Sequence, residues 1–576
     1  MCGIYGVINR KVRREQAMEC LDTMIHRGPD GFGLWQEDGV TLGHRRLAIL
    51  DLSSAGSQPM SYANERYWMT FNGEIYNFIE IREELQHKGY TFRGNSDSEV
   101  IMAAYCEWKE KCVDRFNGMW TFAIWDRQEK SLFLSRDRFG VKPLYYTEFP
   151  DGEFAFASEM KALLPLLEKV EPNKKMFDRY FADNHYESQP ECLIKGIKRF
   201  PAGSYAWIRN GKTEITRFWN TLDHLIEVPD TYEEQVEQFR ELFLDACKIR
   251  MRSDVTLGTG LSGGLDSSAT ICAMSYISRN CADERANKDW QHAYVACFPG
   301  TDLDETKYAK QVTDYLGIRH TFLTIDDAVP EREFLRQLYC FEELWGNPQV
   351  PMMELYKKER ELGTTVSLDG HAADELFAGY GFDVLKAYPD AKGKAEIDQI
   401  TMAYLNQRSE MGYDPSSAEF KRQRNKLYRD YMTKYYAKKL LGRADVSSAY
   451  ADHPNWKKLD NLNKVLFVST HETILPTLLR NYDRDSMASG VEIRMPFLDY
   501  RIVEFAFSIG WKSKLHGGFS KSIVRDACAD FMPHDIAYRR TKLGFNAPIL
   551  DWMRGPYRQF FEDTVLPPKL PSSTYF

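Results

Sequence analysis

A loop of small residues between an apolar strand and a helix constrains the fold of this chain most strongly. Residues 262–268 read Ser-Gly-Gly-Leu-Asp-Ser-Ser, after the β-prone run Val255–Leu261 and before the helical pattern Ser267–Ser278. The alternation continues, with helices predicted at Tyr232–Met251 and Glu305–Leu316 and strands at Ala293–Phe298, His320–Leu323 and Thr364–Leu368. Strands that alternate with helices indicate parallel βαβ units. We therefore expect an α/β domain with a parallel sheet and a mainly helical C-terminal part.

The loop that follows this strand is suited to binding phosphate groups. Its glycines let the backbone approach an anion, its hydroxyls are donors, and the helix N-terminus adds free N–H groups. These candidate phosphate ligands are Ser262, Gly263, Gly264, Ser267 and Ser268. The loop lacks the Lys-Ser/Thr ending of a Walker A motif. Asp266 is unusual in an anion site unless a cation joins it, so we expect Mg²⁺ there, with Asp374 as a second carboxylate ligand.

The same stretch also matches the dinucleotide-binding pattern GxGxxG. Gly258, Gly260 and Gly263 supply the glycines, and Asp283 stands where an acidic residue would bind the ribose. However, Gly258 and Gly260 fall inside the predicted strand, whereas the pattern needs them in the turn after it. The context therefore disfavours a dehydrogenase.

The first half of the chain is rich in predicted strands separated by turns, including Arg27–Gly31, Asn72-Gly73 and Phe149–Gly152. Helical patterns at Arg14–Ile25 and Ile79–Lys88 interrupt them, which indicates an α+β layer structure. The predicted strands are Cys2–Ile8, Val40–Leu50, Tyr67–Phe71, Thr121–Trp125, Ser131–Ser135, Leu144–Thr147, Phe154–Ala157, Ser204–Ile208 and Thr213–Phe218. A polar stretch at Asp223–Thr231 is the predicted linker, and we divide the chain into domains at 2–222 and 232–576.

Cys2 is a candidate nucleophile, because removal of Met1 would leave a thiol and a free α-amine on one residue. An α-amine has an ordinary pKa of roughly 7.7–8.0 and can serve as the base for the thiol. Attack on an amide also needs an oxyanion hole, which Asn72 and Gly73 at a strand end can supply through a side-chain amide and a backbone N–H. Taken alone, Cys2 is more often an inert cysteine and Asn72-Gly73 more often a hairpin turn.

Charged residues near these positions suit a free amino acid as substrate. Arg46 can bind its carboxylate, and Glu74 and Asp97 can bind its ammonium group. Five stretches together resemble class II glutaminase domains, which have an αββα N-terminal-nucleophile fold: Cys2–Ile4, His26–Asp30, His44–Leu47, Phe71–Asn77 and Ser96–Glu99. The resemblance implies that Cys2 is the nucleophile and that Asn72 and Gly73 form the oxyanion hole. The implied glutamine ligands are Arg46, Ile49, Gly73, Glu74 and Asp97.

The loop Ser262–Ser268 looks like the PP-loop of ATP pyrophosphatases, which release pyrophosphate and form an adenylate. With the first half and the stretches Ser486–Asp499 and Gly518–Lys521, the whole chain resembles the glutamine-hydrolysing asparagine synthetase B family. The resemblance implies that Lys521 stabilises charge during adenylation, a role suited to a compact ammonium group. The implied ATP contacts outside the loop are Leu261 and Ala296 at the adenine, and Asp369 and Gly370.

One position departs from the family pattern. Relatives have Ser-Gly-Glu-Gly-x-Asp-Glu after the strand, whereas residues 369–375 read Asp-Gly-His-Ala-Ala-Asp-Glu. Asp374 and Glu375 are retained, but His371 stands at the catalytic glutamate. His371 either accepts a proton from attacking ammonia, marks a different acceptor, or is a structural histidine.

The resemblance implies a glutamine-dependent amidotransferase that uses ATP and Mg²⁺. Ammonia from glutamine would cross a dry internal passage and displace AMP from an acyl-adenylate. L-aspartate is the default acceptor carboxylate, and a sugar uronate, a peptide or a natural-product intermediate is the alternative. A catalytically silent scaffold protein is an alternative of a different class. The resemblance is also consistent with a homodimer.

The composition argues against several other classes of protein. A formal net charge of -8 argues against nucleic-acid binding, and no apolar run is long enough for a membrane span. The 11 cysteines include no CxxC pair, which argues against a zinc site or a disulfide framework and favours the cytoplasm. The Lys/Tyr-rich helical pattern Ala418–Leu441 is either a lid or partner surface, or a helical insertion.

Overall fold

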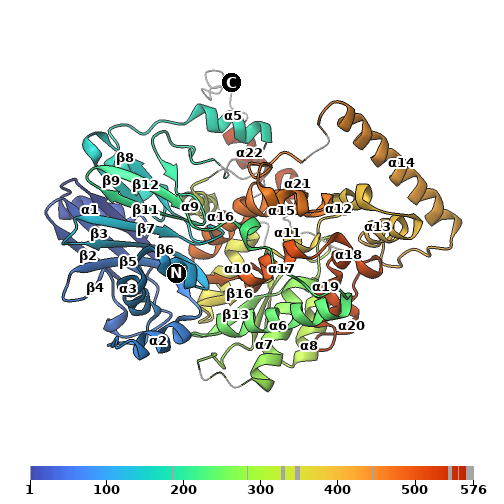
Figure 1. Ribbon diagram of the computed structural model, residues 1–576, viewed down its shortest axis with the longest axis horizontal. Coiled ribbons are helices and arrows are strands. Elements are labelled where there is room, and N and C mark those ends of the chain that lie inside the picture. Colours follow the sequence, from blue (N-terminus) through green and yellow to red (C-terminus); the bar gives the residue numbers. More distant parts are fainter. Residues whose placement is uncertain are drawn as a thin grey trace.

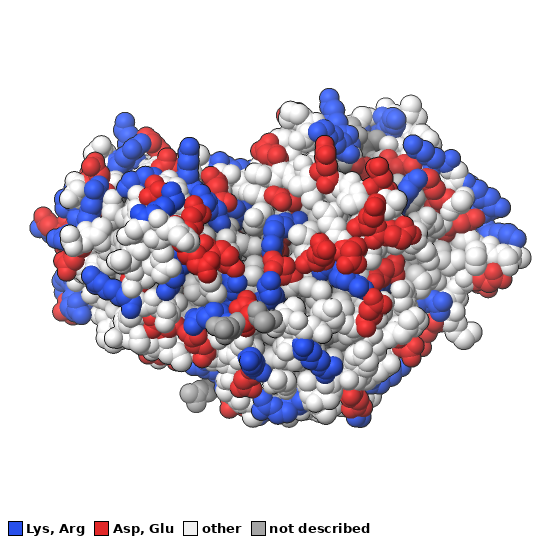
Figure 2. Space-filling view, turned by 60° about the horizontal axis from the view of Figure 1, so that its bottom comes forward, with Lys and Arg blue, Asp and Glu red and all other residues white. Residues whose placement is uncertain are grey.

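The computed structural model describes residues 2–183, 187, 189–281, 283, 285–325, 331–343, 350–443, 446–541, 548–555 and 557–565. Figure 1 shows a strand-rich part, formed by the first half of the chain, beside a mixed part formed by the second half, and the N-terminus lies where they meet. Acidic and basic side chains both occur across the face drawn in Figure 2. Within the described ranges, no helix combines the length and the apolar character needed to cross a membrane.

Two antiparallel sheets form the N-terminal part. The first has the strand order β10-β8-β9-β1-β3-β2 and the second β12-β11-β7-β6-β5-β4. The strands of the first sheet are β1 (Gly3–Ile8), β2 (Gly31–Glu37), β3 (Val40–Arg46), β8 (Tyr145–Glu148), β9 (Phe154–Ala157) and β10 (Lys198–Arg199). Those of the second are β4 (Met60–Tyr62), β5 (Tyr67–Ile75), β6 (Gly118–Asp126), β7 (Ser131–Arg136), β11 (Ser204–Arg209) and β12 (Lys212–Arg217).

The two sheets stack on each other between two layers of helices. Successive side chains of a strand point to opposite faces, so a central strand can serve two cores. Along β1, Ile4 packs with Leu134 of the second sheet, whereas Tyr5 packs with Leu21 of a covering helix. The covering helices are α1 (Arg14–Asp22) on the first sheet, and α2 (Phe78–His87) and α3 (Asp97–Trp108) on the second. The predicted αββα sandwich is confirmed.

A parallel sheet forms the centre of the C-terminal part, as the alternation of strands and helices predicts, and it has a fifth strand, β17 (Glu492–Arg494), that the sequence pattern did not predict. Its order is β15-β14-β13-β16-β17, with β13 (Leu257–Gly260), β14 (His292–Cys297), β15 (Arg319–Thr324) and β16 (Val366–Leu368). From β13 the chain moves first to one side of the sheet and later to the other. Ligands of open α/β sheets bind at the carboxyl ends of strands where the order reverses in this way. Both predicted ATP segments, 261–268 and 369–375, follow strands at this point.

Helices flank this sheet and build the rest of the C-terminal part. Those nearest the sheet are α6 (Tyr232–Arg250), α7 (Leu265–Asn280), α8 (Thr306–Leu316), α10 (Val350–Glu361) and α16 (Ile474–Met487). The other α-helices of the described residues are α4 (Cys112–Arg115), α5 (Lys174–Asp183), α9 (Glu331–Phe341), α11 (Ala373–Phe377), α12 (Gly381–Val384), α13 (Lys394–Asn406), α14 (Ala418–Leu440), α15 (Asn461–His471), α17 (Tyr500–Ser508), α18 (Trp511–Lys514), α19 (Ser522–Cys528), α20 (His534–Ala537), α21 (Ile549–Arg554) and α22 (Arg558–Val565). The predicted Lys/Tyr-rich helix is α14, which runs along the edge of the molecule farthest from the sandwich (Figure 1).

The prediction of a turn or strand end at Asn72-Gly73 is wrong. Strand β5 continues through both residues to Ile75 and remains paired with β6. Glycine is needed at 73 for another reason, because its φ is +154° and a Cβ there would lie 2.1 Å from the Met119 carbonyl oxygen. Helix α3 escapes prediction because its residues 97–105 are all buried, which removes the apolar periodicity of a surface helix.

Candidate active sites

Cys2 lies at the start of β1, beside Asn72 of β5. The Cys2 backbone nitrogen donates to Asn72 Oδ1 at 2.9 Å, and the Cys2 thiol lies 3.8 Å from the Leu47 carbonyl oxygen. Burial raises the pKa of this thiol. Because the thiolate is the reactive form, a thiol with a raised pKa needs a base before it can act as a nucleophile.

Two donors suited to an oxyanion lie at this edge of β5. Asn72 Nδ2 is buried and has no hydrogen-bond partner within the described part of the chain. Phe71 and Ile75 donate their backbone N–H groups to side chains rather than to β6. Since alternate residues of a strand share a direction, the Gly73 N–H points to the same side. Preorganised donors of this kind stabilise the negative charge that develops in acyl transfer.

Glu74 and Asp97 are buried close to a pair of residues from β17. Arg494 Nη2 lies 3.3 Å from Glu74 Oε1, and Arg494 Nε donates to Glu492 Oε1 at 2.7 Å. Burial raises the pKa of Asp97 to about 7 and also raises the pKa of Glu74, with the Glu492 carboxylate acting in the same direction. An additional cation, such as the ammonium group of an amino acid, would stabilise these carboxylates in their charged forms.

Arg46 is the last residue of β3, and Ile49 lies in the loop that follows it. Arg46 donates to the carbonyl oxygens of Asp51 and Ser53 at 2.5 and 2.9 Å. The Ile49 side chain is buried, and its carbonyl oxygen accepts from the Asp254 backbone N–H at 3.0 Å. The Asp254 carboxylate in turn accepts from the Asp51 N–H at 2.8 Å. Asp254 belongs to the C-terminal part, which begins at about residue 232, with helix α6. That part therefore holds the loop of the predicted glutamine ligands.

A cavity of about 540 Å³ opens at the carboxyl ends of β13 and β16, a volume suited to a small ligand. Its lining includes these predicted residues: Leu261, Ser262, Gly264, Asp266, Ser267, Ala296, Asp369, Gly370, His371, Asp374 and Lys521. Gly263 and Ser268 are not among the described residues that line it. Ser268 is fully buried, and Gly263 packs against α8, where a Cβ would lie 2.4 Å from the Ala309 backbone nitrogen.

Asp369 and Gly370 contact β13, α10 and the start of α7, which together form part of the cavity wall. Asp369 accepts hydrogen bonds from the Gly260 N–H at 3.0 Å and from the Tyr356 hydroxyl at 2.7 Å. A Cβ at Gly370 would lie 2.4 Å from the Asp266 carbonyl carbon, so only glycine lets this loop reach the start of α7. Both residues therefore shape the cavity as well as lining it.

Lys521 lies between Asp266 and Asp374 and forms ion pairs with both carboxylates. Burial opposes the charge of Lys521, yet the two carboxylates raise its pKa. Gly379 makes room for this cluster, because a Cβ there would lie 2.3 Å from Lys521 Cε. Asp266 Oδ1 is buried without a hydrogen-bond partner within the described ranges. Two carboxylates beside a phosphate-binding loop, one with an unused oxygen, fit the oxygen ligands that Mg²⁺ prefers.

His371 faces the same cavity from the loop after β16. Its ring stacks on Tyr482 of α16 with centroids 3.7 Å apart, and its Nε2 lies 3.6 Å from Asp369 Oδ2. The side chain is 19% exposed and lines the cavity. This position favours a role toward a bound ligand over a purely structural one.

Sequence reasoning missed three charged residues that lie between the halves of the chain: Arg27, Asp483 and Arg494. Arg27 forms buried ion pairs with Glu159 and Asp483. Arg27 and Arg494 fall in stretches that the sequence singles out, whereas Asp483 falls in none. A motif marks such residues without telling which partner each one meets.

Comparisons with known proteins identify the family. A glutamine amidotransferase domain matches residues 1–219, and asparagine synthase matches residues 238–576. The chain is 30% identical to the glutamine-hydrolysing asparagine synthetase 1 of Bacillus subtilis, over 98% of this chain and 90% of that protein. It is 32% identical to asparagine synthetase 3 of Bacillus subtilis (94% and 86% covered) and 28% identical to asparagine synthetase B of Escherichia coli (94% and 81% covered). The chain therefore belongs to the asparagine synthase family and carries a glutamine amidotransferase domain at its N-terminal side.

Proposed function

We propose that this protein is a glutamine-dependent ligase that uses ATP to convert L-aspartate into L-asparagine. The observation that carries the proposal is the cavity in which Lys521 joins Asp266 and Asp374, in the same chain as Cys2 beside Asn72. The names of the relatives support aspartate as the acceptor. The domain limits 2–222 and 232–576, a cytoplasmic location and a homodimer remain predictions.

The first reaction is the hydrolysis of glutamine. After removal of Met1, the α-amine of Cys2 takes the thiol proton and the sulfur attacks the side-chain carbonyl carbon of glutamine. Asn72 Nδ2 and the Gly73 N–H donate hydrogen bonds to the oxyanion. The carbon–nitrogen bond then breaks, the nitrogen takes up the proton and leaves as ammonia, and water hydrolyses the thioester to glutamate.

The second reaction activates the acceptor. An oxygen of the acceptor carboxylate attacks the α-phosphorus of ATP, and pyrophosphate leaves. The loop of Ser262 and Ser267 and the N-terminus of α7 bind the phosphates, and the Lys521 ammonium stabilises the charge that moves to pyrophosphate. When bound, Mg²⁺ would be held by Asp266 and Asp374 and would add neutralising charge at the phosphates.

The third reaction transfers ammonia. Its nitrogen attacks the acyl carbon of the adenylate, and AMP leaves with the electrons of the carbon–oxygen bond. The attacking nitrogen carries one proton too many for an amide, and His371 is placed to accept it. Ammonia would become protonated in water, so the route between the two sites must be dry.

The proposal is tested by pyrophosphate release from the Met1-processed protein with Mg-ATP and glutamine, with and without L-aspartate, while asparagine is read by mass spectrometry. Aspartate-dependent pyrophosphate with an equal amount of asparagine is the expected result. Glutamine hydrolysis without either product would contradict aspartate as the acceptor. The location of His371 in the cavity favours another carboxylate as the second candidate, and the same assay would then be run with uronates and peptides.

The binding of glutamine is expected to weaken in acid because Asp97 must be ionised to attract its ammonium group. Since burial raises the pKa of Asp97 to about 7, the carboxylate is neutral below that pH. The KM for glutamine should therefore rise by about tenfold for each pH unit below 7. The measurement is glutamine hydrolysis from pH 5.5 to 8.5. Asp97→Asn is the control, and its KM should be high at every pH; a KM that stays constant in the unchanged protein would rule out this role.

Replacement of His371 by alanine should slow ammonia transfer by about 100-fold and leave adenylation in place. The expected time course is a burst of pyrophosphate whose amount equals the number of active sites, followed by slow amide formation. His371→Glu should restore transfer, because a carboxylate can accept the same proton. Rates are compared at a fixed concentration of unprotonated ammonia. Equal rates in the alanine variant and the unchanged protein would make His371 a structural residue.

A further inference from the structure

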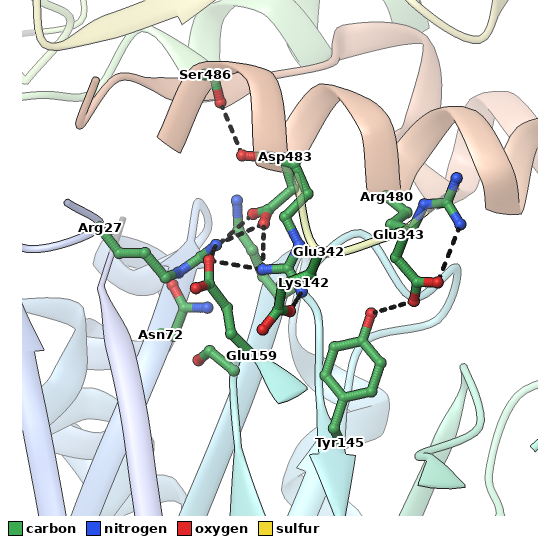
Figure 3. Close-up of polar contacts among 12 residues, drawn as sticks. Arg27, Asn72, Lys142, Tyr145, Glu159, Glu342, Glu343, Arg480, Asp483 and Ser486 are labelled. Atoms are coloured by element: carbon green, nitrogen blue, oxygen red, sulfur yellow. Dashed lines mark hydrogen bonds and ion pairs between the residues drawn. The ribbon is translucent and has the colours of Figure 1, made fainter. Parts of the chain in front are cut away.

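Arg27 connects the Cys2 main chain to the C-terminal half of the protein. Its side chain is fully buried. Arg27 Nε donates to the Cys2 carbonyl oxygen at 3.1 Å, and Nη1 and Nη2 donate to the two carboxylate oxygens of Asp483 at 2.7 and 3.0 Å. In Figure 3, Arg27 extends from the N-terminal part toward helix α16, which carries Asp483. The Arg27 guanidinium thus contacts both Cys2 and Asp483, and Asp483 lies 456 positions after Arg27 in the sequence.

The contact between Arg27 and Asp483 fixes the orientation of the guanidinium. Two parallel hydrogen bonds to a carboxylate hold the planar group in one plane and at one angle. Glu159 Oε1 accepts a further hydrogen bond from Arg27 Nη1 at 2.9 Å. Because these groups are buried, Arg27 cannot exchange Asp483 for water without a large desolvation penalty. The direction of Arg27 Nε, and with it the position of the Cys2 carbonyl, therefore depends on Asp483.

Helix α16 is itself held on both sides of Asp483. The next residue, Arg484, forms ion pairs with Glu159 at 2.7 Å and with Glu342 at 2.9 Å. The preceding residue, Tyr482, stacks on His371 in the cavity of the C-terminal half. Consecutive residues of a helix project about 100° apart. Asp483 and Tyr482 can therefore contact Arg27 and His371, which lie in different directions from α16. Neighbouring residues of a single helix thus contact both Arg27 and the cavity.

Two other residues of the C-terminal part also contact the candidate glutamine site. Arg494 of β17 lies 3.3 Å from Glu74, a predicted glutamine ligand. The Asp254 backbone N–H donates to the Ile49 carbonyl oxygen, and the Asp254 carboxylate accepts from the Asp51 N–H. The C-terminal part therefore contacts Glu74 and the loop of Ile49 directly, and it reaches Cys2 through Arg27.

We propose that Asp483 is a positioning residue for glutamine hydrolysis. Acting through Arg27, it holds the Cys2 main chain so that the thiol faces the carbonyl of glutamine beside Asn72. The inference rests on the proposed function, because it assumes that Cys2 hydrolyses glutamine. It goes further in assigning part of the glutaminase machinery to a residue of the half that carries the ATP cavity.

The test compares Asp483→Asn with the unchanged full-length protein. Asparagine keeps the size of the side chain and removes its charge. We expect kcat for glutamine hydrolysis to fall by about 10–100-fold, with a smaller change in KM, since a small displacement of a nucleophile has effects of this size. Alkylation of Cys2 by a diazoketone analogue of glutamine should slow in parallel. Ammonia-dependent pyrophosphate release should stay within about twofold, because Asp483 does not line the ATP cavity.

Thr477→Val is the matched control on the same helix. The Thr477 hydroxyl donates to Glu187 Oε2 at 2.6 Å across the same interface, but it does not contact Arg27 or Cys2. Its loss should leave both activities unchanged. Asp483→Glu, which restores the carboxylate, should recover part of kcat. If Asp483→Asn does not fold, Arg27→Lys provides the test, because lysine keeps the charge and loses the two-point contact.

The outcomes separate the inference from the proposed function. If the unchanged protein neither hydrolyses glutamine nor reacts with the analogue, the proposed function fails. If it does both and Asp483→Asn matches it, the positioning role is wrong. A parallel loss of both activities together with a lower melting temperature would also overturn the inference, because Asp483 would then only hold the fold together.

Discussion

The Cys2→Ala protein is expected to lose glutamine-dependent amide formation and to keep ammonia-dependent amide formation. In the proposed mechanism, the Cys2 sulfur is the protein atom that forms a covalent bond with glutamine. Glutamine hydrolysis should therefore fall by at least about 10³-fold. The ATP cavity lies in the other half of the chain and does not contain Cys2. Ammonium salts should therefore bypass the loss. The measurement is asparagine formation with glutamine and with ammonium chloride, at equal Mg-ATP and aspartate.

Cys281→Ala is the matched control, because Cys281 is an exposed free cysteine at the C-terminal end of α7 and does not line the cavity. It should behave as the unchanged protein in both assays. A second control retains Met1 in front of Cys2, which blocks the α-amine and should depress glutamine hydrolysis while the thiol remains. Full glutamine hydrolysis in Cys2→Ala would disprove the N-terminal nucleophile.

Lys521→Met is expected to slow the activation of the acceptor by ATP strongly and to leave glutamine hydrolysis intact. Methionine keeps most of the length of the side chain but deletes the charge that Asp266 and Asp374 share. Loss of a preorganised charge at a developing anion costs about 10²–10³-fold in rate, so pyrophosphate release should fall by that factor with either nitrogen source. Glutamine hydrolysis should continue, since Lys521 lies in the other half of the chain.

The variant also leaves two partly buried carboxylates without their cation, which tends to destabilise the fold. The melting temperature should consequently drop and recover in part with added Mg²⁺, because the metal would bind the same carboxylates. Lys512→Met is the control, since Lys512 pairs with Glu396 and does not line the cavity. Lys521→Arg keeps the charge with a different shape and tests whether a compact ammonium is needed. Unchanged pyrophosphate release in Lys521→Met would exclude the adenylation role.

Local sequence was sufficient for the elements whose pattern is set by neighbours along the chain. The parallel sheet follows from strands β13 to β16 alternating with helices, and their apolar runs are visible without tertiary information. Helix α14 was likewise predictable, since its residues read as a helix whatever packs against it. The loop after β13 could be placed at a helix N-terminus for the same reason.

Elements that depend on burial from all sides could not be predicted in this way. Helix α3 has no polar face, and the Asn72-Gly73 pair reads as a turn although it lies within a paired strand. The reason for glycine at 73 is the Met119 carbonyl of the neighbouring strand, which lies 46 residues away. Local sequence also did not show that the Ser268 side chain is fully buried, and its role as a phosphate ligand stays a prediction.

The sequence by itself determined the chemical types: a cysteine at position 2, an Asn-Gly pair, a Ser/Gly loop with Asp266, and Lys521. Only the tertiary structure decided which of these meet. It brings Lys521 between Asp266 and Asp374, and it joins Cys2 to Asp483 through Arg27. The physical reason is that a side chain's identity is local, whereas burial and charge pairing depend on residues hundreds of positions apart. The candidate glutamine site therefore lies in the N-terminal part of the chain and is contacted by residues of the C-terminal part.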